Sequence, residues 1–242
     1  MANDRRLTTN DPLLYYITDR TAFAPDESTR RRRLLEKIAE ATRAGVDYIQ
    51  LREKDLPTRE LESLAREAVY IVHEARKLST LLINSRTDIA LAAGADGVHL
   101  RSDDISPQEV AAIWSKTHVG IAAIGCPAAQ SASVVDGLSQ RGVIGVSCHS
   151  PEEVRRAEAS GATFAVFAPV FEKKGAPGVQ SAGLVQLREA CKARIPVLAL
   201  GGVTLETAKS CLEAGAAGIA AIRLFQDDDV ARIVDALRQL TR

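Results

Sequence analysis

Hydrophobic and polar positions form a repeating pattern of helical stretches and short apolar runs along the chain. Four times a helical stretch ends in glycine, at positions 45, 94, 161 and 215, and an apolar run such as "VDYIQL" follows. A glycine after the last turn supplies the left-handed residue that ends a helix, and a run rich in Val, Ile and Phe is typical of a buried strand. The pattern therefore indicates the helix-to-strand joint of a wound parallel fold.

The predicted strands number eight. The joints place four of them within residues 43–51, 92–100, 159–167 and 213–222, and the other four are predicted at residues 13–18, 80–84, 143–147 and 196–200. Segments with helical periodicity follow, for example at residues 58–77, 107–115, 151–160, 204–213 and 230–240. Eight alternating units favour the α/β class and a single closed (β/α)8 TIM barrel over an open sheet.

Two segments stand outside this repeat. Residues 1–11 are polar and are predicted to be a flexible leader before a barrel domain at residues 12–242. The interval between the second and third joints is long, and its excess is interpreted as an insertion near residues 120–142. Alternatively, residues 119–124 are themselves a strand, and the fifth strand of the barrel is shifted.

Composition narrows the class of partner. The 242 residues are 46% hydrophobic, and 31 basic residues balance 31 acidic ones. Because the chain has no surplus of basic residues, we do not expect it to bind a nucleic acid or an anionic membrane. We expect small molecules as its ligands. No run of about 18 apolar residues occurs, and the four cysteines form no C-x-x-C pair. These features predict a soluble cytoplasmic protein with free thiols, and we allow for a homo-oligomer.

Candidate chemistry begins at the end of the second predicted strand, in "DYIQLREK". Side chains alternate faces in an extended chain, so Gln50, Arg52 and Lys54 are predicted to point one way and Leu51 and Glu53 the other. In a (β/α)8 barrel the active site lies at the carboxyl ends of the strands. Two cations and an amide are therefore expected to converge at the mouth of the barrel.

The other strand ends supply further polar side chains to the same rim. The candidates are Asn84, Ser85 and Arg86, then Arg101, Asp103 and Asp104, and then Ser147 and His149. Two loops are typical of a phosphate site in this fold: the Gly201-Gly202 turn before a helix that starts near Thr204, and Ile222-Arg223 at the end of the last strand. Arg52, Lys54 and Arg101 form a second cationic focus across the mouth. This arrangement suits one phosphate and one larger anion.

Each candidate also has a structural interpretation. Arg52 and Lys54 can simply pair with acidic neighbours, among them Glu53, Asp103 and Asp104. A lone histidine such as His149 is more often structural than catalytic, and His99 within a strand is predicted to pack and to form hydrogen bonds. A glycine pair after a strand is ordinary turn chemistry. The functional interpretation depends on all of them meeting at one rim.

Several motifs in order resemble one known superfamily. These are "YYITDR", "IQLREKDL", "LINSRTDIALAAGADGVHLRSDD", "IGVSCHSPEEVRRAEASGATFAVFAPVF" and "LALGGVT". They resemble the thiamin phosphate synthase and TenI-like superfamily over about residues 14–225. The resemblance implies a (β/α)8 barrel that joins hydroxymethylpyrimidine pyrophosphate to thiazole phosphate and releases pyrophosphate with the help of Mg²⁺.

The resemblance also implies roles for individual residues. Gln50, Arg52 and Lys54 would hold the pyrophosphate, Asn84 and Ser147 would contact the pyrimidine, and Asp104 would bind the metal. Gly202, with Gly201 beside it, Ile222 and Arg223 would surround the thiazole phosphate. Arg52, Lys54, Asn84 and His149 are the candidates for catalysis.

Three positions depart from the synthase pattern. Ser85 stands where synthases carry an aspartate, so one of two magnesium carboxylates is missing and a weakened Mg²⁺ site is expected. "EKKGAPG", at residues 172–178, replaces a Thr-x-Thr-Lys loop, with Lys173 or Lys174 as the substitute for its lysine. Arg223 replaces a small residue.

The TenI-like branch tolerates these losses and is the first alternative. By resemblance it moves a proton on a thiazole phosphate tautomer without a metal, and it uses a histidine at the position of His149. Histidine suits this chemistry because imidazole ionises near neutral pH. Synthases commonly have the same histidine, so His149 does not distinguish the synthase from the tautomerase. The retained Gln50, Arg52, Lys54 and Asp104 favour the synthase, and a non-catalytic protein that binds thiazole phosphate is a third hypothesis.

Overall fold

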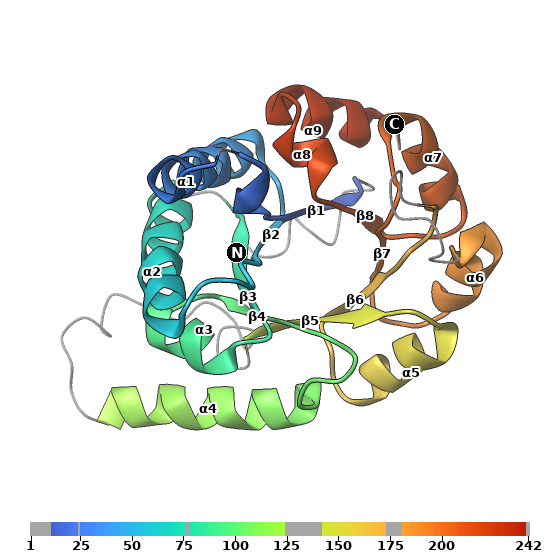
Figure 1. Ribbon diagram of the computed structural model, residues 1–242. Helices are drawn as coiled ribbons and strands as arrows, with labels where there is room; N and C mark the ends of the chain where they lie inside the picture. The colour runs from blue at the N-terminus through green and yellow to red at the C-terminus, as the bar shows by residue number, and fades with distance from the viewer. Residues whose placement is uncertain (1–10, 24, 76–77, 124–141, 173–180, 241–242) are drawn as a thin grey trace.

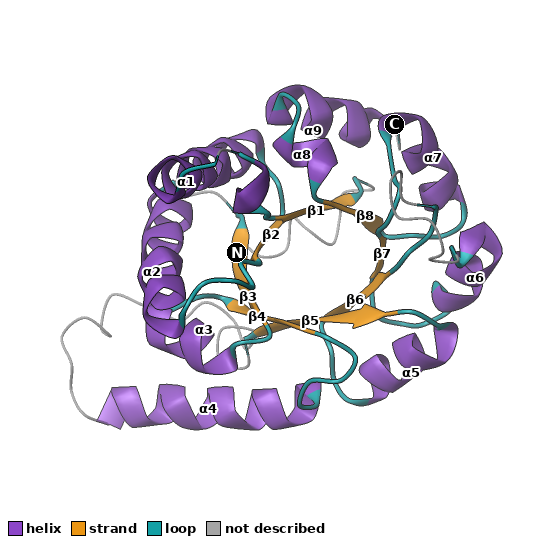
Figure 2. Ribbon diagram, in the orientation of Figure 1, coloured by secondary structure: helices purple, strands orange, loops and turns teal. Residues whose placement is uncertain are grey.

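Eight parallel strands close into a barrel in the order of the chain. The computed structural model describes residues 11–23, 25–75, 78–123, 142–172 and 181–240, without the side chains of residues 118–123. Strand β1 pairs with β2 on one side and with β8 on the other, so the sheet has no free edge. The strands form an inner ring and the helices surround it (Figure 1, Figure 2). The predicted α/β class and single (β/α)8 barrel are confirmed.

All eight predicted strands are present, some of them shorter than predicted. They are β1 (Leu13–Ile17), β2 (Tyr48–Leu51), β3 (Thr80–Asn84), β4 (Gly97–Leu100), β5 (Val143–Cys148), β6 (Phe164–Phe167), β7 (Val197–Ala199) and β8 (Gly218–Ala221). The helices are η2 (Arg20–Ala22, a 3-10 helix), α1 (Glu27–Ala44), α2 (Thr58–Glu74), α3 (Thr87–Ala93), α4 (Pro107–Ala123), α5 (Pro151–Ala159), α6 (Gly183–Ala190), α7 (Leu205–Glu213), α8 (Arg223–Gln226) and α9 (Val230–Gln239).

The alternative strand at residues 119–124 is wrong. Residues 119–123 complete helix α4, and the fifth strand lies at Val143–Cys148, where the first interpretation put it. Most of the predicted insertion, residues 124–141, lies outside the described residues, as does the predicted leader apart from Asp11. Both therefore stay predictions.

The four glycines that were predicted to end helices all have positive φ, between 71° and 103°. Gly45, for example, follows α1 with a φ of 88°, and its N–H bonds the last turn of that helix. Each joint turns the chain back into the next strand without the steric cost that a side chain would add. In the described ranges, no helix is long and apolar enough to cross a membrane.

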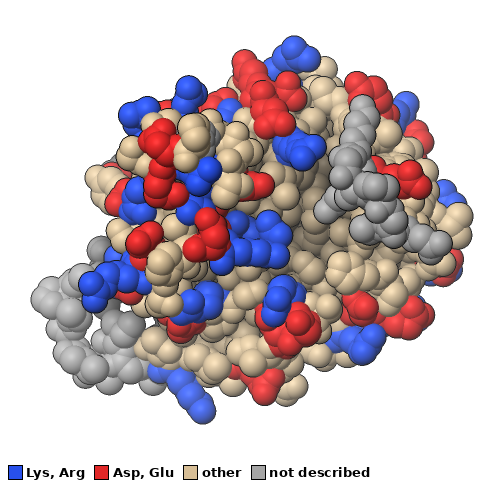
Figure 3. Space-filling model, viewed as in Figure 1, with Lys and Arg blue, Asp and Glu red and all other residues tan. Residues whose placement is uncertain are grey.

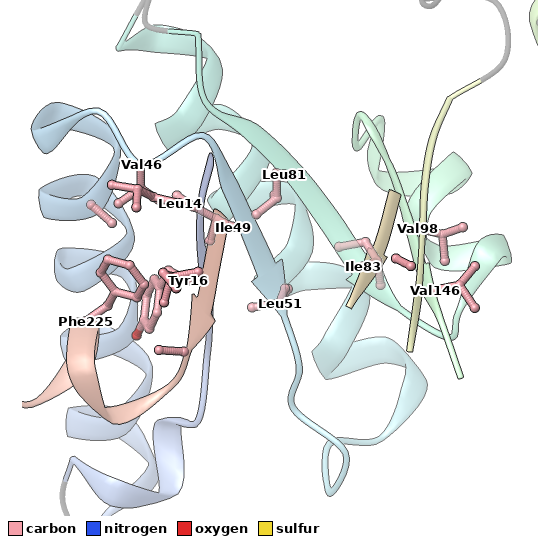
Figure 4. Close-up of a cluster of buried hydrophobic side chains, with 14 of the residues drawn as sticks. Leu14, Tyr16, Val46, Ile49, Leu51, Leu81, Ile83, Val98, Val146 and Phe225 are labelled. Carbon is pink, nitrogen blue, oxygen red and sulfur yellow. The ribbon is translucent and has the colours of Figure 1, made fainter. Parts of the chain in front are cut away.

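Two hydrophobic layers result from the alternation of side chains along the strands. Outward-facing residues such as Leu14, Tyr16, Ile49 and Leu51 pack under the helices (Figure 4). Inward-facing residues form a second cluster: Tyr15, Ile17, Tyr48, Leu82, Phe164, Val166, Leu198 and Ala220. The inner aromatic rings interlock, with centroids 5.4 Å apart for Tyr15 and Phe164 and 4.8 Å apart for Tyr48 and Phe164. They fill the barrel interior, so the open space lies at its mouth.

Candidate functional site

A cavity of about 970 Å³ opens at the carboxyl ends of the strands. Figure 3 looks onto this face and shows basic side chains gathered beside a hollow near its middle. The cavity is lined by these residues from the predicted site: Gln50, Arg52, Lys54, Asn84, Ser147, His149, Gly201, Gly202, Ile222 and Arg223. The predicted meeting of these side chains at one rim is thus observed, and their roles stay predictions. Lys173 lies outside the described residues.

The end of strand β2 presents its side chains as the alternation predicts. Gln50, Arg52 and Lys54 line the cavity, whereas Leu51 packs in the outer hydrophobic layer and Glu53 is 4% exposed. Strand β2 therefore turns its polar side chains to the mouth of the barrel.

Asn84, at the end of β3, is joined to this wall by its amide. Gln50 Nε2 donates to Asn84 Oδ1 at 2.8 Å, and Asn84 Nδ2 donates to Ser85 Oγ at 3.2 Å. Ser85 has a φ of 59°, in the left-handed region. The bonds hold two amides next to each other, so a ligand meets a pre-arranged polar surface.

The guanidinium of Arg52 is available to a ligand, because it forms no salt bridge with any residue that the structure describes. Arg101 differs: its Nε lies 3.2 Å from Asp103, and its Nη2 lies 3.3 Å from Asp104. The structural interpretation, in which Arg52 pairs with Glu53, Asp103 or Asp104, is therefore wrong for this residue. Arg101 is partly neutralised and contributes less to the cationic focus than predicted.

His99 lies at the floor of the cavity, and the sequence did not single it out for function. Its Nδ1 lies 3.0 Å from Tyr15 Oη and its Nε2 lies 2.8 Å from Ser147 Oγ. Burial, and next the positive charge of Arg52, lower the pKa of His99 to about 3. The imidazole is therefore neutral at ordinary pH. The prediction that His99 packs and forms hydrogen bonds is confirmed, and the residue also fixes the position of the Ser147 hydroxyl.

His149 projects from the end of β5 into the cavity lining. Its backbone N–H donates to Glu153 Oε2 at 2.7 Å, and its Nδ1 lies 2.7 Å from the carbonyl oxygen of Ala168. A carbonyl oxygen only accepts, so Nδ1 carries the proton in this arrangement. The Nε2 lone pair is then left for a ligand or for proton transfer.

A second part of the cavity wall is built by the turn after β7 and the start of α8. Gly201 has a φ of 96°, and a Cβ there would lie 2.7 Å from Pro169; Gly202 has a φ of 65°, and a Cβ there would lie 2.7 Å from the carbonyl oxygen of Glu172. Both positions need glycine for two reasons, backbone conformation and space. Helix α7 begins just after this turn, with Thr204 as its N-cap.

Acidic side chains also reach this wall, although none of them was predicted from the strand ends. Glu206, Asp227 and Asp228 line the cavity together with Arg223 and Arg232. The mixed charges make this wall less basic than the β2 wall. The positive groups on this wall are Arg223 and Arg232, and the acidic side chains partly offset their charge.

The carboxylates fit a magnesium ion only in part. Asp103 lines the cavity, but Asp104 is not among the lining residues. Asp104 accepts hydrogen bonds from the backbone N–H of Arg101 at 2.8 Å and from its guanidinium at 3.3 Å. Burial works against ionisation of Asp104, but its bonds with Arg101 and Ser85 lower its pKa. Within the described residues, no group of three or more His, Cys, Asp or Glu side chains could hold a metal.

Comparison with known proteins identifies the family. The family model described as thiamine monophosphate synthase matches residues 14–133 and 124–225. The chain belongs to this family. A relative from Syntrophomonas wolfei, named thiamine-phosphate synthase, is 35% identical over 240 residues and matches 97% of this chain and 98% of its own length. A putative thiamine-phosphate synthase 2 from Aquifex aeolicus is 38% identical, over 88% of this chain and 97% of its own length.

A solved structure of the family has the same barrel. The thiamine phosphate pyrophosphorylase of Pyrococcus furiosus superposes with a TM-score of 0.71 and 28% sequence identity, over 96% of each chain. The family resemblance, predicted from motifs at the strand ends, is confirmed over almost the whole chain.

Proposed function

We propose that the chain is a thiamin phosphate synthase, which joins hydroxymethylpyrimidine pyrophosphate to thiazole phosphate and releases pyrophosphate. The observation that carries the proposal is the convergence of Gln50, Arg52, Lys54 and Asn84 in the lining of one cavity, which a glycine turn also lines. One wall suits a pyrophosphate and the other suits a single phosphate. Family membership and the names of the relatives support this activity.

Each wall has a separate task in this proposal. Gln50, Arg52 and Lys54 bind the pyrophosphate of the pyrimidine substrate, and Asn84 and Ser147 bind its ring. Gly201, Gly202, Ile222 and Arg223 bind the phosphate of the thiazole. With both substrates held in one cavity, the reaction becomes effectively unimolecular, which alone removes a large part of the barrier.

The proposed step exchanges one bond for another. The bond between the pyrimidine methylene carbon and the pyrophosphate oxygen breaks, and the bonding pair leaves with the pyrophosphate. The lone pair of the thiazole nitrogen forms the new bond to that carbon. Negative charge grows on the leaving oxygen, so the guanidinium of Arg52 and the ammonium of Lys54 stabilise the transition state more than the bound substrate.

Magnesium enters this proposal as an expectation. Mg²⁺ commonly binds through one or two carboxylates together with phosphate oxygens. Asp104, with Asp103 nearby, would hold it, and most other ligands would come from pyrophosphate and water. When bound, the ion adds positive charge beside the leaving group. Ser85 supplies no carboxylate, so the affinity of the protein for Mg²⁺ without pyrophosphate is expected to be low.

The activity is tested by incubating the protein with both substrates and saturating Mg²⁺ and measuring thiamin phosphate and pyrophosphate by chromatography. Arg52→Met should lower kcat/KM by about 100-fold, the size of the loss when one stabilising donor is removed. Arg86→Met is the matched control, because Arg86 lies on the same rim but pairs with Asp88 at 2.6 Å and does not line the cavity. The absence of product from the unaltered protein would refute the proposal.

A second candidate, the TenI-like tautomerase, is favoured by the bond that holds His149. His149 lines the cavity and its Nδ1 is bound to the Ala168 carbonyl, so Nε2 is the ring nitrogen that we propose as the base for a proton of thiazole phosphate. His149→Ala should abolish tautomer conversion and leave thiazole phosphate binding intact. Binding of thiazole phosphate with neither turnover would instead identify a non-catalytic binding protein.

We also place the protein in the cytoplasm. The proposed substrates are phosphorylated metabolites, and Cys148, Cys191 and Cys211 are free thiols. Free thiols fit a reducing compartment.

A further inference from the structure

A cluster of charged side chains, centred on the buried pair Arg20 and Glu53, lies beside the end of strand β2. Arg20, in the 3-10 helix after β1, has a side chain that is only 3% exposed. Its Nη1 and Nη2 atoms donate to the two oxygens of Asp55 at 2.7 and 3.0 Å. Its Nε and Nη2 atoms donate to the two oxygens of Glu27 at 2.8 and 3.1 Å. Because a guanidinium that bonds two carboxylates has a fixed orientation, the cluster ties the β1–α1 turn to the loop after β2.

Glu53, the residue between Arg52 and Lys54, belongs to this cluster. Its side chain is 1% exposed, and its carboxylate accepts from the backbone N–H of Arg20 at 3.1 Å and from Nη1 of Arg20 at 3.3 Å. The hydroxyl of Thr18 donates to the same carboxylate at 2.5 Å. Burial raises the pKa of Glu53, and these bonds act in the opposite direction. The carboxylate is thus held on the side of the chain that faces away from the cavity.

Thr18 connects this carboxylate to the backbone of the cavity wall. Thr18 is fully buried at the end of β1, and its N–H donates to the carbonyl oxygen of Gln50 at 3.0 Å. Its hydroxyl oxygen accepts from the backbone N–H of Arg52, also at 3.0 Å. One hydroxyl therefore bonds both the residue that presents a cation to the cavity and the acidic residue that follows it.

We infer that Thr18, Arg20 and Glu53 are positioning residues for the anion-binding wall. Their hydrogen bonds determine which face of residues 50–54 looks into the cavity. None of the three lines the cavity, so they act through Arg52 and Lys54. The inference rests on the proposed function, in which those two cations bind pyrophosphate.

The bonds guard against one particular error. Neighbouring side chains point to opposite faces of an extended chain, so a rotation or a slip by one residue would turn Glu53 into the cavity and Arg52 out of it. A carboxylate in that place would repel pyrophosphate. A hydrophobic residue at position 53 would often give equal or better stability than a buried ion pair, but it would form no directional bonds. The cluster therefore accounts for orientation better than for stability.

The test measures binding of inorganic pyrophosphate by titration calorimetry. Thr18→Val keeps the shape of the side chain but removes both hydrogen bonds of the hydroxyl. We expect the Kd for pyrophosphate to rise about tenfold. This factor corresponds to about 1.4 kcal/mol, close to the value of one hydrogen bond to a charged group. Thr18→Ser keeps the hydroxyl and should bind within about twofold of the unaltered protein. Binding of thiazole phosphate, which we propose takes place at the glycine turn, should not change in either variant.

Thr42→Val is the matched control for the loss of a buried hydroxyl. Thr42 is also fully buried, and its hydroxyl donates to the carbonyl oxygen of Ile38 at 2.8 Å within α1, away from the cavity lining. It should lose stability and keep its affinity for pyrophosphate. If Thr18→Val fails to fold, Glu53→Gln is measured in its place, with the same expected loss of affinity.

Two results would overturn the inference, and they differ. If Thr18→Val, or Glu53→Gln in its place, binds pyrophosphate with the same Kd as Thr42→Val, the positioning role alone is overturned. No pyrophosphate binding by the unaltered protein would overturn the proposed function and the inference with it. If Thr18→Val binds pyrophosphate about tenfold more weakly and Thr18→Ser binds it normally, the result supports both the proposed function and the positioning role.

Discussion

Replacing Gly201 with alanine tests the close packing of the turn at which we propose that thiazole phosphate binds. Gly201 has a φ of 96°, and a Cβ added there would lie 2.7 Å from both Cα and Cβ of Pro169. Gly45 offers a matched control, because its φ is 88° and a Cβ there would meet nothing within 4 Å. Both substitutions place alanine at a similar positive φ, and only the one at Gly201 adds a steric clash.

The magnitudes follow from these two terms. Alanine in the left-handed region costs about 1–2 kcal/mol. Alanine also lowers the conformational entropy of the unfolded chain, which stabilises the folded state by about 0.4–1 kcal/mol. Gly45→Ala should therefore lower the free energy of unfolding by about 1 kcal/mol. At Gly201 the added methyl must displace backbone and ring atoms of Pro169, and overpacking of this kind costs a further 1–3 kcal/mol or so. Gly201→Ala should thus cost about 2–4 kcal/mol.

The free energies are measured by urea unfolding, followed by both fluorescence and circular dichroism so that a populated intermediate would be detected. The same samples are titrated with thiazole phosphate. Gly201→Ala should weaken that binding, since the turn must shift away from Pro169, whereas Gly45→Ala should bind normally. The reasoning fails if the two variants are equally stable, because the 2.7 Å approach would then have no energetic consequence.

Three further predictions concern other parts of the molecule. The hydrogen bond of His73 with Asp96 raises the pKa of His73, so its stabilisation should be complete below about pH 6.5 and lost as pH rises through the raised value. Because His73 is 48% exposed, His73→Gln should lower stability by only about 0.5 kcal/mol at pH 5.5 and have no effect at pH 9, as checked by urea unfolding at both values. Ser85→Asp places a second carboxylate near Asp104, at a φ of 59° that aspartate tolerates. It should lower the Mg²⁺ concentration for half-maximal activity by about tenfold. An unchanged concentration would show that the metal lies elsewhere. Burial raises the pKa of the Cys148 thiol to about 12, so alkylation at pH 8 should label it only after unfolding in urea, and rapid labelling of the native protein would contradict this.

The repeat of helix, glycine and apolar run was sufficient to predict the barrel. A left-handed glycine and a strand with alternating faces are consequences of local backbone geometry, so neighbouring residues alone reveal them. The same alternation predicted correctly that Gln50, Arg52 and Lys54 share a face from which Glu53 is excluded. The known architecture of barrels then brought distant strand ends to one rim.

Local pattern was insufficient between the fourth and fifth strands. Residues 119–123 are apolar enough to read as a strand, and they belong instead to the last turns of α4. A short apolar run fits either element, and the choice depends on what packs against it rather than on its own letters.

The sequence by itself determined the elements, their order and the faces of the strands, since these depend on neighbours in the chain. Only the tertiary structure decided which polar groups are partners: Tyr15 with His99 across 84 positions, and Thr18 with Glu53 across 35. It likewise showed Arg101 paired with Asp103, whereas Arg52 forms no salt bridge with any residue in the described ranges. A hydrogen bond depends on a few tenths of an ångström between atoms from different strands, and no spacing along a sequence encodes that distance.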